Sequence, residues 1–369
     1  MGTEYFYIGT YTQPILFGTG DIFHGKGKGI YLLSLNTKTG SISLEGEPAP
    51  ADNPSYLCIS PDGNDLYAVN ELKEFDGQAC GAVSAFSINP STKSLTYLNS
   101  RPTGGMDPCH VIVNRAQTHV YVSNFMSGSI CVFPIEDNGY LGNTSQLIQH
   151  EGSSVISARQ KGPHAHSLAF DRTQAHAFVP DLGIDKLMVY KTDFAKGTLA
   201  PADTPFYQTF PGAGPRHCEF HPNYRFCYLI NEIASSVSCL YYDEGAASFT
   251  LKQTIATIPG DYKGNNICAD LHLTPDGRYL YASNRGHNTL AAFSVNQDTG
   301  ELTLLDIVPC GGEVPRNFCI NSSGRFLLAG NQDTDNITVF SICQDTGRLT
   351  KIYDLPVPSP VCIRQFLNP

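Results

Sequence analysis

The stretch from Pro215 to Glu232, PRHCEFHPNYRFCYLINE, contains a short apolar strand, a turn and a second strand that ends in Asn. The same 18-residue pattern recurs without gaps as PSYLCISPDGNDLYAVNE, PCHVIVNRAQTHVYVSNF, AHSLAFDRTQAHAFVPDL, CADLHLTPDGRYLYASNR and PRNFCINSSGRFLLAGNQ. The six units begin at residues 54, 108, 165, 215, 268 and 315, so successive starts lie 47 to 57 residues apart. Repeats of this length indicate one closed or stacked repeat architecture.

Each unit is followed by a third apolar run, such as SICVFPI or TLAAFSV, and then by a turn and a fourth short run. Four short strands rich in β-branched and aromatic residues are typical of a β-propeller blade. Residues 360–366 look like a first strand alone, whereas residues 5–11 look like a second strand without its first. We therefore predict an all-β, seven-bladed propeller over residues 1–369, with four antiparallel strands per blade and one blade closed by strands from both termini.

Two other all-β arrangements are less compatible with the repeat. A pair of β-sandwiches would also show short, evenly spaced strands, but it would not require six gap-free copies of one unit. The chain contains no Trp, which excludes the Trp-Asp signature of one common propeller type.

The composition limits the partners and the location. Hydrophobic residues make up 41% and charged residues 16% of the chain, which suits a globular protein with a sizeable core. The net charge of -10 argues against nucleic acid as a partner. No apolar stretch is long enough to span a membrane and the N-terminus does not resemble a signal peptide, so we expect a cytoplasmic protein that does not bind membranes. The twelve cysteines include no C-x-x-C pair and are interpreted as free, mostly buried thiols.

When the six units are aligned, two positions, called columns here, depart from the pattern of the repeat. We expect both columns at one mouth of the central channel. Structural positions in a repeat should look alike, so departures are candidates for function. The start of one strand lies beside the end of its antiparallel neighbour. The first column, one residue after each unit start, is Ser55, Cys109, His166, Arg216, Ala269 and Arg316. The second column, the last residue of each unit, is Glu71, Phe125, Leu182, Glu232, Arg285 and Gln332.

A mouth with several convergent charged groups is the default location of a ligand site. Three arginines that face one cavity repel each other, which predicts an anionic ligand such as a phosphate or carboxylate. The alternative for Arg216 is a structural ion pair with Glu232. A single histidine is more often a packing residue than a catalyst, and this alternative applies to His110 and His164.

Several motifs resemble the seven-bladed propeller lactonases, a family that includes bacterial 6-phosphogluconolactonases and fungal 3-carboxy-cis,cis-muconate cycloisomerase. The similar segments are GTYT at 9–12, PHAHS at 163–167, GAGPRH at 212–217, NE at 231–232, ASNR at 282–285 and PRN at 315–317. In the cycloisomerase branch a His, an Arg, a Glu and a second Arg are implicated in catalysis, and the resemblance assigns these roles to His166, Arg216, Glu232 and Arg285. Residues 13–29 depart from the bacterial pattern as an insertion.

The resemblance and the columns together predict an enzyme that hydrolyses a phosphorylated sugar lactone, with 6-phosphogluconolactone as the first candidate. Ester hydrolysis needs a base for water and donors for the oxygen that gains charge, and neither role requires a metal. The sequence shows no nucleotide, flavin or metal motif, so we expect no cofactor. We expect a monomer or weak homodimer whose partner is a small anionic substrate. The predicted substrate-binding residues are His110, His164, His217, Asp270 and Arg316.

Two other functions remain open. A cycloisomerase would use the same groups to move a proton while arginines hold carboxylates. A propeller that binds proteins without catalysis would instead present a large exposed apolar patch.

Overall fold

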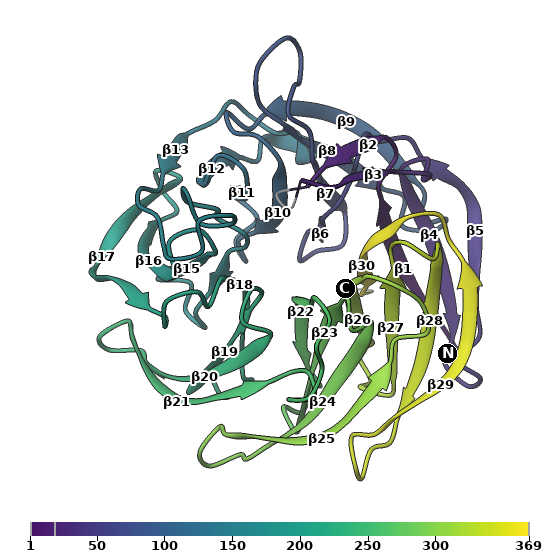
Figure 1. Ribbon diagram of the computed structural model, residues 1–369. Coiled ribbons are helices and arrows are strands. Elements are labelled where there is room, and N and C mark those ends of the chain that lie inside the picture. Colours follow the sequence, from purple (N-terminus) through teal and green to yellow (C-terminus); the bar gives the residue numbers. More distant parts are fainter. Residues whose placement is uncertain (1, 18–19, 368–369) are drawn as a thin grey trace.

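The computed structural model describes residues 2–17 and 20–367. Seven sheets of four antiparallel strands are arranged in a ring, and the innermost strand of each sheet borders the central channel (Figure 1). The predicted seven-bladed, all-β propeller is therefore confirmed. Within the described residues, the only helix is one turn of 3-10 helix, η1 (Asp137–Gly139), and no helix has the length and hydropathy of a membrane span.

The blades follow the chain, each from its inner to its outer strand. The blade that joins the termini consists of β30 (Pro360–Phe366), β1 (Thr3–Thr10), β4 (Ile30–Asn36) and β5 (Ile42–Ala49). The next three consist of β6 (Leu57–Ile59), β7 (Asp65–Asn70), β8 (Ala82–Ile88), β9 (Leu95–Pro102); β10 (Pro108–Val113), β11 (His119–Asn124), β12 (Ser129–Pro134), β13 (Gln146–Gln149); and β14 (Ala169–Phe170), β15 (His176–Asp181), β16 (Lys186–Asp193), β17 (Thr198–Gln208).

The last three blades follow the same order. They consist of β18 (Pro215–Phe220), β19 (Phe226–Asn231), β20 (Ser236–Asp243), β21 (Ser248–Ala256); β22 (Ile267–Leu273), β23 (Tyr279–Arg285), β24 (Thr289–Val295), β25 (Leu302–Pro309); and β26 (Pro315–Ile320), β27 (Phe326–Asn331), β28 (Asn336–Ile342), β29 (Leu349–Pro356).

The ring closes where the C-terminal strand β30 pairs with β1. The register runs from Tyr5 opposite Phe366 to Thr10 opposite Pro360. This is the pairing that the two incomplete units at the chain ends predict, and it covers the edge of β1 that would otherwise be free to pair with another molecule.

Most inner strands carry a β-bulge at the first column of the repeat. In blades that begin at β10, β18 and β26, the register jumps at Cys109, Arg216 and Arg316, so each of these residues has no partner on the neighbouring strand. A bulge adds one residue to a strand and changes the direction of its side chain. The β-bulge that recurs in these blades therefore directs the first-column side chains toward the channel mouth.

Buried side chains connect neighbouring blades and fix the second column. Tyr67, Tyr228 and Tyr281 are fully buried and donate hydrogen bonds to the carbonyl oxygens of Gly139, Gly300 and Gly347, all about 70 residues farther along the chain. Each buried aromatic ring contributes about 2 kcal/mol through burial. A repeated Asn is the last or the next-to-last residue of the second strand in five blades. Its amide bonds to a neighbouring loop or strand, as the Asn231 amide does to Ser236 and Ser238. The next residue is thereby held at the mouth.

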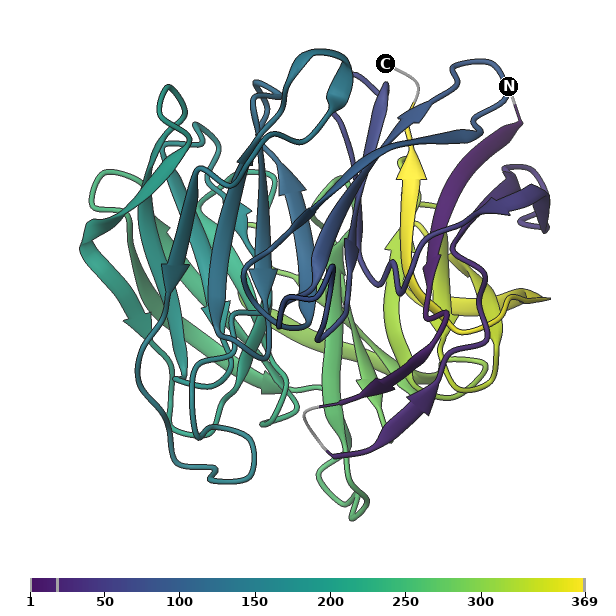
Figure 2. The ribbon, with the colours of Figure 1, turned by 90° about the horizontal axis from the view of Figure 1, so that it is seen from above.

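The insertion at residues 13–29 forms a two-stranded hairpin, β2 (Pro14–Leu16) and β3 (Ile22–His24). Figure 2 shows this hairpin in purple on the face opposite the marked chain ends. Its aromatic rings pack on Tyr11, with ring centroids 5.8 Å away for Phe17 and 5.9 Å for Phe23. The described residues of the insertion therefore pack on this face of the propeller.

Candidate active site

A cavity of about 900 Å³ lies at the mouth that the hairpin covers. Eight of the twelve residues in the two columns line it, and they come from six different blades: Glu71, Cys109, Phe125, His166, Glu232, Arg285, Arg316 and Gln332. The structure therefore brings two thirds of the column residues to one mouth, and Ser55, Leu182, Arg216 and Ala269 are not among the lining residues. The cavity is large enough for a phosphorylated sugar.

Glu232 is the centre of the polar floor. Its Oε1 accepts a hydrogen bond of 2.6 Å from Arg159 Nη2, and its Oε2 accepts one of 2.7 Å from Arg285 Nη2. Arg216 Nε also lies 3.0 Å from Oε2, although its N–H does not point at that oxygen, so this contact is a charge pair without a hydrogen bond. Burial raises the pKa of Glu232, but the arginines outweigh it and hold the pKa far below its usual value. Glu232 is thus a permanent anion shared by three guanidiniums.

Arg316 is held separately from this cluster. Its guanidinium lies 3.6 Å from Glu71 Oε1, and it stacks on Tyr11 and Phe17 at 5.4 and 5.5 Å from the ring centroids. The Tyr11 hydroxyl donates a 2.9 Å hydrogen bond to the other oxygen of Glu71. The hairpin therefore takes part in orienting this arginine.

The ion-paired cluster of the floor carries an excess of positive charge. Four guanidiniums, those of Arg159, Arg216, Arg285 and Arg316, face two carboxylates, Glu232 and Glu71, which leaves a surplus of two within this cluster. Three further carboxylates line the cavity: Asp107, which is paired with Lys73, and Asp21 and Asp333. The sequence predicted an external anion as the counter-charge for the arginines. The structure shows that Glu232 supplies part of that counter-charge within the protein.

His166 lines the cavity as a neutral imidazole. Burial, and next the charge of Arg216, lower its pKa well below 6.5. Its Nδ1 lies 3.6 Å from the Cys109 sulfur, and its ring packs edge-on against Phe125 with centroids 5.2 Å apart. Its Nε2 has no hydrogen-bond partner within residues 2–17 and 20–367. A neutral imidazole with a free nitrogen in a cavity can accept a proton.

The other predicted site residues lie beside or beneath the cavity. The imidazole of His164 stacks on Phe125 at 4.7 Å and bonds to that residue's carbonyl oxygen, so it supports the wall. Arg216 belongs to the floor through its contact with Glu232, but it is 3% exposed and is not among the lining residues. His217 and Asp270 form the layer below it, and His110 lines a smaller cavity of about 360 Å³ elsewhere on the channel. Of the nine predicted site residues, four line the main cavity directly: His166, Glu232, Arg285 and Arg316.

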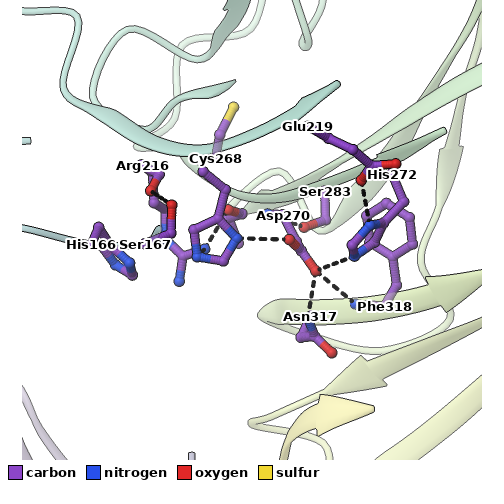
Figure 3. Close-up of polar contacts among 12 residues, drawn as sticks. His166, Ser167, Arg216, Glu219, Cys268, Asp270, His272, Ser283, Asn317 and Phe318 are labelled. Atoms are coloured by element: carbon purple, nitrogen blue, oxygen red, sulfur yellow. Dashed lines mark hydrogen bonds and ion pairs between the residues drawn. The ribbon is translucent and has the colours of Figure 1, made fainter. Parts of the chain in front are cut away.

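Figure 3 shows the polar network that runs from this floor into the channel. His217 Nδ1 lies 2.9 Å from Asp270 Oδ1, and His272 bridges Asp270 Oδ2 at 3.0 Å and Glu219 Oε2 at 2.7 Å. Burial lowers the pKa of His272, but the two carboxylates outweigh it and raise that pKa to about 10. His272, whose side chain is 22% exposed, is therefore a partly buried imidazolium ion between two carboxylates.

Three lining elements were not found in the sequence. Arg159 belongs to the long loop between β13 and β14, where no repeat column exists to compare it with. Asp107 precedes a unit start, and the structure places Val314, the corresponding residue of another blade, in the same lining. Comparison of a third column, one residue before each unit start, would have identified both Asp107 and Val314. Phe17 and Phe23 lie in the insertion, whose hairpin the repeat does not predict.

The fold is a seven-bladed propeller, and its site places a neutral histidine beside clustered arginines. Together they define a propeller enzyme. The family model "Lactonase, 7-bladed beta-propeller" matches residues 5–365, so the chain belongs to that family of enzymes. It is 35% identical to 6-phosphogluconolactonase of Bacillus subtilis over 85% of this chain and 83% of the relative. It is 34% identical to 6-phosphogluconolactonase of Formosa agariphila over 80% and 83% of the two chains. The solved structure of Pseudomonas aeruginosa periplasmic gluconolactonase superposes with a TM-score of 0.90 and 30% identity, covering 100% of both chains.

Replacement of Glu232 by Gln should destabilise the protein. The substitution leaves three guanidiniums, of which Arg216 is buried and Arg159 and Arg285 are partly buried, without their shared anion. This should lower the free energy of unfolding by about 3 kcal/mol in urea denaturation. Added sulfate should restore part of the loss, because it can occupy the floor. The exposed carboxylate Glu301 provides the control, and Glu301→Gln should change stability by less than about 0.5 kcal/mol. Equal stability of Glu232→Gln and wild type would contradict the shared-anion description.

The pH dependence of stability should report the His272 imidazolium. Its folded pKa of about 10 lies above the unfolded value near 6.5, so its contribution is complete below about pH 6.5 and is lost as the pH rises toward 10. Wild type should lose stability between pH 7 and 10 more steeply than His272→Gln in urea denaturation at each pH. Parallel slopes for the two proteins would show that His272 is not charged in the folded state.

Proposed function

We propose that the chain hydrolyses the ester bond of a phosphorylated sugar lactone, with 6-phospho-D-glucono-1,5-lactone as its substrate and 6-phosphogluconate as its product. The observation that carries the proposal is the neutral His166, whose Nε2 has no hydrogen-bond partner among the described residues, beside a cluster of four guanidiniums paired with only two carboxylates. Relatives named 6-phosphogluconolactonase at 34–35% identity support the same substrate. Such a reaction would belong to the pentose phosphate pathway.

In the proposed mechanism, His166 accepts a proton from a water molecule that attacks the lactone carbonyl. The carbonyl oxygen gains negative charge, and the guanidiniums of Arg216 and Arg285 stabilise it. The protonated His166 then returns the proton to the ring oxygen as the carbon–oxygen bond breaks. Glu232 is a poor base because three arginines stabilise its charge, so we assign it the orientation of those arginines. These steps use side chains of this chain, one water molecule and the substrate.

The phosphate of the substrate would bind to guanidiniums of the floor whose charge the carboxylates do not fully neutralise. Arg316 and Arg159 are the guanidiniums with the most exposed side chains in the floor, at 11% and 15%. One guanidinium group can donate two parallel hydrogen bonds to two oxygens of a phosphate. We therefore assign them to the phosphate, with His164 as a wall that positions Phe125. The cytoplasmic location and the monomer or weak homodimer remain parts of this proposal, and free cysteines suit a reducing compartment.

The purified protein should accelerate hydrolysis of 6-phosphogluconolactone at a pH where the spontaneous reaction is slow. His166→Ala and Arg285→Ala should each lower kcat by about 100-fold or more, because each removes a group that acts in the transition state. His176→Ala serves as the control, since this histidine pairs with Asp171 far from the cavity lining. A full lactonase rate in His166→Ala would refute the assignment of the base.

Parallel assays separate the proposal from its alternatives. Gluconolactone without phosphate should react with a kcat/KM at least about 100-fold lower, since it lacks the anion that Arg159 and Arg316 would bind. A 3-carboxymuconate should not cyclise. Turnover of the carboxymuconate and inertness toward both lactones would instead establish a cycloisomerase, and inactivity on all three would favour a binding protein.

The pH profile should reflect the lowered pKa of His166. A base is active when it is unprotonated, and this pKa lies well below 6.5, so kcat should not fall between pH 8 and pH 6.5. Initial rates over this range, corrected for spontaneous hydrolysis, provide the measurement. A decline centred near pH 6.5 would mean that the imidazole titrates as if exposed.

A further inference from the structure

Asp270 connects four inner strands from one position below the cavity floor. It lies on β22 and is 1% exposed. Its Oδ1 accepts a hydrogen bond of 2.9 Å from His217 on β18, and its Oδ2 accepts from His272 on its own strand and from the Asn317 amide on β26 (Figure 3). Asn317 in turn accepts a 2.6 Å hydrogen bond from the backbone N–H of Ile363 on β30. The carboxylate has no oxygen left for a substrate.

These contacts determine which nitrogen of His217 carries the proton. Burial and the neighbouring charge of Arg216 lower the pKa of His217 to about 4, so the ring is neutral and has one N–H. Nδ1 faces a carboxylate oxygen, which can only accept. Nε2 lies 3.2 Å from Arg216 Nη1, which can only donate. Both neighbours therefore select the Nδ1–H tautomer.

This tautomer holds the Arg216 guanidinium in one orientation. Nη1 donates to the carbonyl oxygen of Ala269 and to His217 Nε2, while Nε faces Glu232. Nη2 has no hydrogen-bond partner in the part of the chain that the structure describes. With the other tautomer, an N–H of His217 would face Nη1, and the two donors would repel each other.

We propose that Asp270 is a positioning residue that acts through the tautomer of His217 to direct Arg216 Nη2 at the oxygen that gains charge in the reaction. This inference rests on the proposed lactonase function. It replaces the substrate contact that the sequence predicted for Asp270 and His217. His272, held between Asp270 and Glu219, keeps Asp270 ionised and so keeps the acceptor in place.

The test uses Asp270→Asn, His217→Ala and the double variant, with 6-phosphogluconolactone as substrate. Asp270→Asn should lower kcat by about 100-fold and change KM by less than about 3-fold, because the interaction with Arg216 matters in the transition state. The double variant should be no slower than His217→Ala, since Asp270 acts only through that ring. Multiplied losses, or a raised KM with unchanged kcat, would overturn the proposal.

A readout independent of activity comes from nitrogen NMR of protein labelled at histidine. Wild-type His217 should show an unprotonated Nε2 and a protonated Nδ1, and Asp270→Asn should alter this pattern. Asp171→Asn is the matched control, because Asp171 also pairs with a histidine, His176, at 3.0 Å but lies outside the cavity lining. It should lower stability without changing kcat. A protonated Nε2 in wild type would refute the inference even if the lactonase activity is confirmed, whereas inactive wild type would refute only the function.

Discussion

The antiparallel pairing of β30 with β1 is the constraint on which the rest of the molecule depends. It joins the two ends of the chain in one blade and makes seven sheets into a closed ring. Side chains from the first and last complete repeats, such as Glu71 and Arg316, can meet only because the ring is closed. The hydrogen bond from Ile363 to Asn317 extends the same closure to the polar layer under the site.

The bulges of the inner strands turn this regular ring into a site. A strand without a bulge would keep the alternation of side chains between its two faces. At Cys109, Arg216 and Arg316 the extra residue changes the direction of the side chain, so the channel mouth receives groups that the ladder would have buried in a blade. The irregularity is repeated, but the side chain placed on it differs from blade to blade. This combination allows one scaffold to hold many different groups in a fixed geometry.

The charge balance of the floor links stability to function. Glu232 stabilises three guanidiniums that would otherwise repel each other, and the cost of burying them falls because each is paired. Complete neutralisation of the arginines would leave no positive charge to bind an anionic ligand. Arginines without any carboxylate partner would destabilise the fold. The surplus of two positive charges lies between these limits. Burial is the main cause of the lowered pKa of His166, and the arginine charges that attract an anion lower it further.

The sequence by itself determined the number of blades, the shared blade of the termini and the two columns at the mouth, because a repeat reports the same backbone position many times. It also identified Glu232 and His166 as departures from the pattern. Only the tertiary structure decided how the charges divide, since Arg159 comes from a loop outside the repeat and completes the pairing of Glu232. It also decided that Asp270 lies beneath the cavity and bonds to protein donors alone. The depth at which a side chain lies along the channel depends on β-bulges and on contacts between blades. The spacing of residues within one strand predicts neither.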